Sequence, residues 1–177
     1  QSVYIYNYDS ETKRWSRESI NDGTRKENLV GDEIKFIYDD VKNFVENRDH
    51  YMKYKIPYKR GYLLHGPPGT GKTSLIKTLA NEFNRNIYCL QLQNKEIDDQ
   101  TLMNMINHIQ ENCIIVFEDI DVNRLIASEE GGNSITISCL LNVLDGLQAN
   151  SGIITVFTTN HVQDLFEKLP SSFFRPG

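Results

Sequence analysis

A glycine-rich segment followed by a lysine and a threonine is the part of the sequence best suited to chemistry. Residues 66–73 read GPPGTGKT, which matches the phosphate-loop pattern G-x-x-x-x-G-K-[ST], between an apolar run and a segment with helical spacing. Glycines let backbone N–H groups turn inward as a nest for anionic oxygens, and the N-terminus of the following helix adds partial positive charge. Lys72 can reach the β- and γ-phosphates, and the Thr73 hydroxyl is a suitable magnesium ligand. The pattern predicts a nucleoside triphosphate and Mg²⁺ bound by Gly66, Pro67, Pro68, Gly69, Thr70, Gly71, Lys72, Thr73 and Ser74.

An apolar run at residues 114–117 ends in two carboxylates, Glu118 and Asp119. Hydrolysis of a nucleoside triphosphate needs one carboxylate that holds magnesium through its waters and another that orients the attacking water. The usual order is Asp then Glu, whereas here Glu comes first. We assign Glu118 to the metal and Asp119 to the water; the alternative is a solvated acidic turn after a strand.

Two further residues could act on the γ-phosphate. Asn160 follows the next apolar run and could reach the attacking water or the γ-phosphate as a sensor; a β-turn is the alternative for a Thr-Thr-Asn triplet taken alone. Arg175 lies far along the sequence from the nucleotide of its own chain, so it could serve a neighbouring subunit and stabilise charge that develops on the γ-phosphate. The alternative for Arg175 is a surface arginine before a turn.

The elements that must position these residues alternate between strands and helices. The first helix is expected to start from Asp32 as its N-cap. Helices are expected at about 32–47, 49–55, 72–83, 101–111 and 137–148, and strands at about 62–64, 87–92, 113–117 and 153–158. The alternation predicts an α/β fold with a parallel sheet covered by helices on both faces. In such a sheet the ligand lies at the carboxyl ends of the strands, where the phosphate loop, the carboxylate pair and Asn160 all fall.

Residues 1–28 are predicted to form a hairpin at the end of a preceding domain, followed by a linker. Residues 3–8 alternate like a strand, Asp9-Ser10 is typical of a turn, and Trp15 falls on the returning strand. Residues 21–23, Asn-Asp-Gly, are also typical of a turn and place the linker at about 21–28. The nucleotide-binding core is expected over residues 29–177.

Composition limits the class of protein and its partners. With 177 residues, 20.4 kDa and 39% hydrophobic residues, the chain is about one domain with enough apolar side chains for a core. The net charge of −5 and the pI of about 5.4 argue against a nucleic-acid partner. Mean hydropathy is −0.47, and no apolar run approaches the roughly 20 residues of a membrane span. Cys89, Cys113 and Cys139 form no C-x-x-C pair and are expected to be buried free thiols in a reducing compartment.

Four motifs together resemble those of the AAA+ ATPases: GPPGTGKT, IIVFEDID, VFTTN and a terminal FFRPG. Within that family, KIPYKRGYLLHGPPGTGKTSL, FEDID, LLNVLDGL and TTNH are similar to the Bcs-type branch, which is named for a mitochondrial inner-membrane chaperone. The resemblance covers about residues 29–177, and the Glu-Asp order is itself a feature of that branch. It implies a P-loop NTPase fold whose last core strand and helical lid lie downstream of this chain.

The resemblance also implies a role for each matched residue in the nucleotide site. Val30 and Gly31 would contact adenine, and residues 66–73 would form the Walker A loop. Glu118 and Asp119 would be the Walker B pair. ATP and Mg²⁺ are the implied cofactors.

Assembly and location follow from the same resemblance. Asn160 would be sensor 1, and Arg175 would be the first arginine of an R-P-G-R motif. The implied assembly is a homo-oligomeric ring, a hexamer or a heptamer, that acts on a protein client. The mitochondrial member carries a membrane helix upstream, so the expected place is either the mitochondrial inner membrane facing the matrix, with membrane association through a segment before Gln1, or the cytoplasm.

The function predicted from these features is ATP hydrolysis by an oligomeric AAA+ motor that remodels or translocates a protein client, as a Bcs-like chaperone does. Residues 91–97, QLQNKEI, lack the aromatic residue and the glycine of a threading loop, which disfavours peptide threading. A first alternative is an ATP-binding switch with little hydrolysis, supported by the shorter Asp119 side chain at the water position. A second is a DNA-linked loader ATPase, against which the acidic charge argues.

Overall fold

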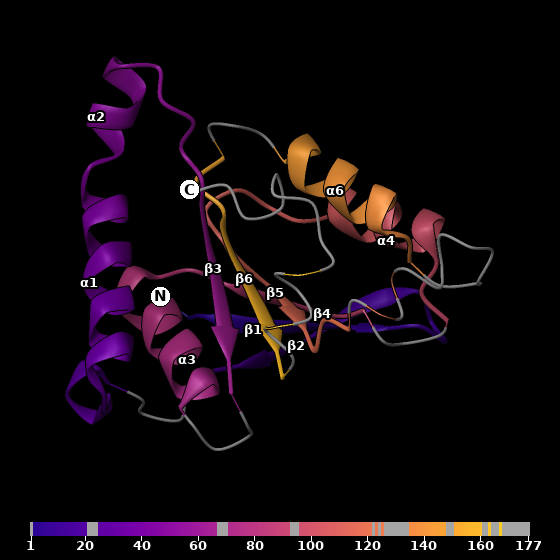
Figure 1. The fold of residues 1–177 in the computed structure, drawn as a ribbon, viewed down its shortest axis with the longest axis horizontal. Coiled ribbons are helices and arrows are strands. Elements are labelled where there is room, and N and C mark those ends of the chain that lie inside the picture. The colour runs from indigo at the N-terminus through magenta and orange to yellow at the C-terminus, as the bar shows by residue number, and fades with distance from the viewer. Residues whose placement is uncertain are drawn as a thin grey trace.

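One six-stranded β-sheet runs through the computed structural model, with helices on both of its faces (Figure 1). The structure describes residues 2–20, 25–66, 71–92, 96–121, 123, 125, 135–147, 151–160, 163 and 167. The strands are β1 (Tyr4–Asp9), β2 (Arg14–Ser19), β3 (Arg60–His65), β4 (Ile87–Gln91), β5 (Ile114–Glu118) and β6 (Ile154–Thr159). Their order across the sheet is β2-β1-β4-β5-β6-β3, and all neighbours are parallel except β1 and β2. The predicted α/β class is therefore confirmed.

Two layers of helices cover the sheet. α1 (Asp32–Glu46) and α3 (Lys72–Phe83) lie on one face, and α4 (Asp99–Asn107) and α6 (Ile137–Gly146) lie on the other (Figure 1). A short 3-10 helix, η1 (Lys26–Asn28), precedes α1, and α2 (Arg48–Lys53) follows it.

The central strand β5 shows why the sheet needs both layers. Successive side chains of a strand point to opposite faces. Ile114 and Val116 pack with α1 and α3, and Ile115 and Phe117 pack with α4 and α6. The helical side chains in these two clusters include Val41, Phe44, Leu75 and Leu79 on the first face and Leu102, Met105, Leu140 and Val143 on the second. The continuous apolar run thus belongs to a strand that is buried on both faces, as predicted.

The helix α4 starts earlier and ends earlier than the sequence predicted. It starts early because the Asp98 side chain caps it by accepting a hydrogen bond from the N–H of Thr101 at 2.8 Å. After Asn107 the chain turns away, Asn112 adopts a φ of 54°, and its N–H donates to the carbonyl oxygen of Ser151 at 2.9 Å. The end of α4 itself is marked by tighter bonds, because the N–H groups of His108 and Ile109 donate to the carbonyl oxygens three residues back, at 3.2 and 3.1 Å.

The N-terminal hairpin predicted from the sequence is present, and it extends the sheet. β1 and β2 pair with Tyr8 opposite Trp15, and β1 also pairs in parallel with β4. The rings of Tyr6 and Tyr88 stack with their centroids 4.6 Å apart, and the Trp15 ring meets Tyr88 edge-on at 5.3 Å. A domain boundary near residue 28 stays a prediction; the hairpin and the core share one sheet.

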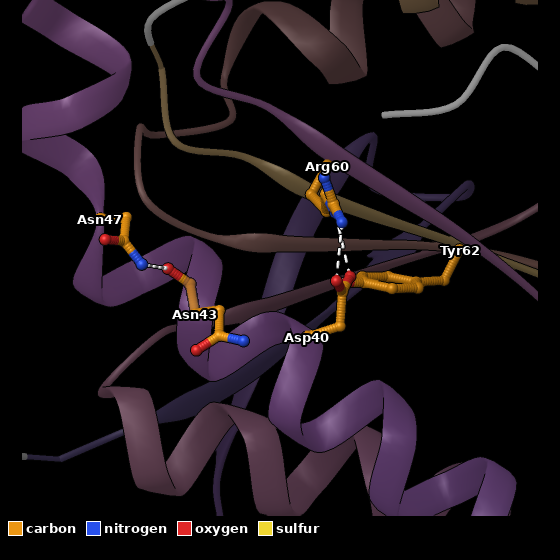
Figure 2. Close-up of polar contacts among 5 residues, drawn as sticks. All are labelled: Asp40, Asn43, Asn47, Arg60 and Tyr62. Atoms are coloured by element: carbon orange, nitrogen blue, oxygen red, sulfur yellow. Dashed lines mark hydrogen bonds and ion pairs between the residues drawn. The ribbon is translucent and has the colours of Figure 1, made fainter.

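A polar cluster joins α1 to the edge strand β3 (Figure 2). Arg60 donates from Nε and Nη2 to the two carboxylate oxygens of Asp40 at 3.0 and 2.7 Å, and the Tyr62 hydroxyl donates to Oδ2 of Asp40 at 2.5 Å. Burial acts to raise the pKa of Asp40, but these hydrogen bonds and the Arg60 charge outweigh it, so the pKa lies below its usual value. The fork-shaped pair fixes the middle of α1 against β3.

A cavity of about 860 Å³ lies next to this cluster, where β3 forms the edge of the described sheet. Its walls come from both helical layers, with Phe44 and Tyr51 on the α1–α2 side and Leu144 on α6. Gly61 and Phe157 line it from the sheet.

A helix that crosses a membrane must be both long and apolar. In the part of the chain that the structure describes, no helix combines the length and the apolar character of such a span.

Candidate active site

The strand β3 and the helix α3 frame the predicted phosphate loop. Lys72 is the first residue of α3, and its Nζ donates a hydrogen bond to the carbonyl oxygen of Gly66 at 2.6 Å. Gly66 and Gly71 have φ angles of 126° and 91°, a region that L residues rarely adopt, so both positions require glycine. Four of the predicted loop residues lie outside the described ones: Pro67, Pro68, Gly69 and Thr70.

The first turn of α3 offers positive charge to an anion. Thr73 and Ser74 are exposed there, and the helix N-terminus carries partial positive charge. In the part of the chain that the structure describes, no carboxylate lies within ion-pair distance of Lys72. A phosphate group would therefore meet a lysine whose charge is not already neutralised by a neighbouring side chain.

The start of α1 lies against the end of the phosphate loop. A Cβ at Gly71 would lie 3.2 Å from Cδ1 of Ile34, which shows how closely the first turn of α1 packs there. The N-cap of α1 is Gly31, with a φ of 107°, and the predicted cap Asp32 is instead the first helical residue, where its charge favours the helix N-terminus. Val30 is 81% exposed. The packing brings the first turn of α1 beside Gly71, and Val30 and Gly31 directly precede that turn in the sequence.

Glu118 is the last residue of β5 and is half-buried. Gln91 lies opposite it at the end of β4 and donates from Nε2 to Oε2 of Glu118 at 3.3 Å. Burial raises the pKa of Glu118, the Gln91 hydrogen bond opposes this, and the negative charge of Asp119 adds to it, so that the pKa lies above its usual value. A divalent cation bound there would favour the charged carboxylate.

The turn after β5 is hydrogen-bonded to the end of β6. Asp119 has a φ of 52°, and its N–H donates to Oγ1 of Thr158 at 3.0 Å. The N–H of Ile120 donates to the carbonyl oxygen of Thr158 at 2.9 Å, and the Thr159 hydroxyl donates to the carbonyl oxygen of Ile120 at 3.0 Å. Asn160 follows directly and is exposed.

The parallel pairing brings these strand ends to one edge of the sheet. His65 at the end of β3 is in register with Thr159, and Gln91 is in register with Glu118. The phosphate loop, the carboxylate pair and Asn160 therefore share the carboxyl edge, where an α/β sheet binds its ligand. Arg175 lies outside the described residues.

The donor set at this edge fits a magnesium ion that arrives with a nucleotide. In the described ranges, no group of three or more His, Cys, Asp or Glu side chains is arranged to hold a metal. Mg²⁺ usually takes one or two carboxylates together with substrate phosphates and water, so it does not need such a group. Thr73 and Glu118 are the residues that could hold it.

The three cysteines are free thiols. Cys113 and Cys139 are buried and Cys89 is partly buried, which confirms most of the sequence expectation. Burial raises the pKa of Cys89 and Cys113 to about 12 and that of Cys139 to about 11, so all three stay protonated and unreactive near neutral pH.

Two residues of this region, Gln91 and Thr158, contact the carboxylate pair but were not predicted to do so from the sequence. In the sequence, Gln91 belongs to a segment that lacks the features of a threading loop, and Thr158 belongs to the Thr-Thr-Asn triplet that ends at Asn160. The signal that could have found both is strand register, because the parallel neighbours β4 and β6 end beside β5.

The sequence profile of the family described as ATPase family associated with various cellular activities (AAA) matches residues 62–175. This span holds the phosphate loop, the carboxylate pair and Asn160, and it is more than half of the chain. The chain belongs to the AAA ATPase family, and nucleotide binding and the predicted ATPase class follow from that membership.

Curated proteins similar to the chain include Bcs-type chaperones, as the motifs predicted. The probable mitochondrial chaperone bcs1 of Schizosaccharomyces pombe is 40% identical over 147 residues, which cover 81% of this chain and 32% of that protein. The mitochondrial chaperone BCS1 of Homo sapiens is 37% identical over 146 residues, covering 78% and 34%. The probable mitochondrial chaperone BCS1-A of Dictyostelium discoideum is 37% identical over 159 residues, covering 84% and 37%. The chain spans about a third of the length of these relatives.

Proposed function

We propose that the chain is the ATP-hydrolysing core of an oligomeric Bcs-like motor that remodels or translocates a protein client. The observation that carries the proposal is the meeting of the phosphate loop, Glu118–Asp119 and Asn160 at one edge of the sheet. Family membership supports the hydrolytic class, and the names of the relatives support the chaperone role.

Residues of the phosphate loop and of α1 bind the nucleotide in this proposal. The backbone of residues 66–73 surrounds the phosphates, and Lys72 leaves the Gly66 carbonyl to contact the β- and γ-phosphates. Val30 and Gly31 contact adenine; the packing of Ile34, in the turn of α1 that follows them, close to Gly71 supports this. Thr73 and Glu118 would hold Mg²⁺, and the bound ion would supply positive charge beside the phosphates.

Asp119 and Asn160 act on the attacking water. Asp119 accepts a hydrogen bond from the water and orients it for in-line attack, and Asn160 contacts the water or the γ-phosphate. Both residues are exposed at the carboxyl edge, where a water can reach them. The raised pKa of Glu118 is compatible with its role, because a bound cation restores the ionised form.

The proposed assembly is a ring of six or seven copies. Arg175 serves the site of a neighbouring subunit by stabilising charge on its γ-phosphate. The client is a protein, and the place of action is the mitochondrial inner membrane facing the matrix, with the cytoplasm as the alternative; the mitochondrial relatives support the former. No nucleic-acid partner is proposed, in keeping with the acidic charge.

The cavity beside β3 supports the further expectation of a last core strand downstream. β3 is an edge strand of the described sheet, and an uncovered edge offers unpaired backbone groups to another strand. We propose that this strand pairs with β3 next to Gly61. Amide hydrogen exchange at β3 would then be slower in a chain extended through that strand than in residues 1–177.

An ATP-binding switch with little hydrolysis is the second candidate, because Asp119 is a short side chain at the water position. Phosphate release from ATP, with and without Mg²⁺, separates the two in a protein extended through its lid. The motor predicts Mg²⁺-dependent turnover. Tight ATP binding without phosphate release, at any protein concentration, would favour the switch.

A further inference from the structure

The turn that follows β5 begins with Asp119, and its backbone conformation must be stabilised by contacts from outside β5. Asp119 has a φ of 52°, in the left-handed region where the Cβ of an L residue crowds the following carbonyl. Asp tolerates this region better than most residues, but such a conformation persists only where the surrounding structure fixes it.

Strand β6 supplies much of that support, and Thr158 makes two of the contacts. Oγ1 of Thr158 accepts the N–H of Asp119 at 3.0 Å, and the Thr158 carbonyl accepts the N–H of Ile120 at 2.9 Å. Thr158 is 9% exposed and Ile120 is 2% exposed, so the bond between these two residues is shielded from water, and the bond from Asp119 to Thr158 is partly buried. Of the two bonds that Thr158 makes, a substitution can remove the side-chain bond to Asp119.

The turn also decides where the second carboxylate lies. If β5 continued, the side chains of Glu118 and Asp119 would point to opposite faces of the sheet. The left-handed residue interrupts this alternation, so the direction of the Asp119 side chain depends on the turn being held.

We propose that the Thr158 hydroxyl is a positioning group of the ATPase site. It holds the Asp119 turn and so fixes the two carboxylates relative to Asn160, which lies further along the same segment as Thr158. Thr158 acts through the backbone of Asp119 and contacts neither the nucleotide nor the water. This inference rests on the proposed hydrolytic function and adds a residue to it.

Three substitutions test the inference. Thr158→Val removes the acceptor and keeps the branched shape, and Thr158→Ser keeps a hydroxyl. Thr155→Val is the matched control, because it makes the same change on β6 at a buried residue that lines the cavity beside β3. Thr158→Ala also removes the acceptor and replaces the valine variant if that variant does not fold.

Steady-state kinetics in the protein extended through its lid give the first readout. Thr158→Val should lower kcat for ATP by about 10-fold or more, with KM and nucleotide affinity changed by less than about 2-fold, because the substitution displaces groups that act on the water. Thr158→Ser and Thr155→Val should stay within about 3-fold of the parent protein. An equal loss of kcat in the serine and valine variants at 158 would overturn the inference.

Amide exchange of Asp119, followed by NMR without nucleotide, gives a readout that does not depend on activity. Exchange should be slow in the parent, Thr158→Ser and Thr155→Val proteins, and about 10-fold faster or more in Thr158→Val. Unchanged exchange in Thr158→Val overturns the inference. The two proposals can fail separately. If the parent protein never hydrolyses ATP, the proposed function is wrong. If the Asp119 amide still exchanges faster in Thr158→Val, the contact of Thr158 with the turn is nevertheless confirmed.

Discussion

The Lys72 amine donates a hydrogen bond to the carbonyl oxygen of Gly66 at 2.6 Å and so spans the phosphate loop. The bond joins the first residue of α3 to the residue that follows β3. Because the partner is a neutral carbonyl, the lysine charge stays available to a phosphate.

We predict that Lys72→Ala abolishes tight ATP binding, because it removes the main counter-charge on the phosphates. A hydrogen bond to a charged group contributes about 1.5–3 kcal/mol, which corresponds to a loss of affinity of about 10- to 100-fold. Calorimetric titration with ATP and Mg²⁺ measures the change. Lys42→Ala, at an exposed position of α1, is the control. Unchanged affinity in the Lys72 variant would refute the assignment of the site.

For Asp119 we predict a loss of turnover without a loss of binding. Asp119→Asn keeps the size of the side chain but removes the charge that orients the water, so kcat should fall by about 100-fold or more. Phosphate release and ATP affinity are measured side by side, with Glu111→Gln as an exposed control before the start of β5. A turnover equal to that of the parent protein would support the ATP-binding switch instead.

Spacing and apolar pattern were sufficient to predict the four core strands β3, β4, β5 and β6, the two helical layers and the edge where the candidate site lies. A strand such as β5, buried on both faces, is a continuous apolar run, and the phosphate loop must lie between a strand and a helix. Trp15 was also placed correctly on the returning strand of the hairpin.

Contacts between distant segments could not be predicted in the same way. Gln91 and Glu118 are 27 residues apart, and Asp119 and Thr158 are 39 apart, and each pair meets only because of the strand order. The pairing of β1 with β4 has the same cause, since local alternation predicts a strand but does not select its neighbour. The apolar pattern continues through Ile109, so it did not predict that α4 ends at Asn107.

The predicted role of Arg175 is tested by mixing subunits. Arg175→Ala should keep ATP binding and lose hydrolysis in the assembled ring, because a neighbour's site lacks its arginine. Adding a Lys72→Ala subunit, which binds ATP weakly but has an intact arginine, should restore part of the activity. Failure to restore activity at every mixing ratio would mean that Arg175 does not act in trans.

We predict that the Asp40–Arg60 pair stabilises the fold and that this contribution depends on pH. The folded-state pKa of Asp40 lies below its usual value of about 4, so its contribution to stability is present above that value and is lost as the pH falls through the folded-state pKa. Asp40→Asn should lower the free energy of unfolding by about 1–3 kcal/mol at pH 7 and remove this part of the acid dependence.

Denaturant titrations between pH 7 and pH 3 measure this effect. Asp39→Asn is the matched control, because the neighbouring residue is exposed on the same helix. An equal pH dependence in the parent and Asp40→Asn proteins would show that the pair does not contribute to acid unfolding.

The rate of ATP hydrolysis per subunit, measured against protein concentration in a chain extended through its lid, tests the central claim most directly. We expect a rate that climbs steeply with concentration and then saturates, because neighbouring subunits complete each active site. A low rate that does not change with concentration would contradict the ring motor.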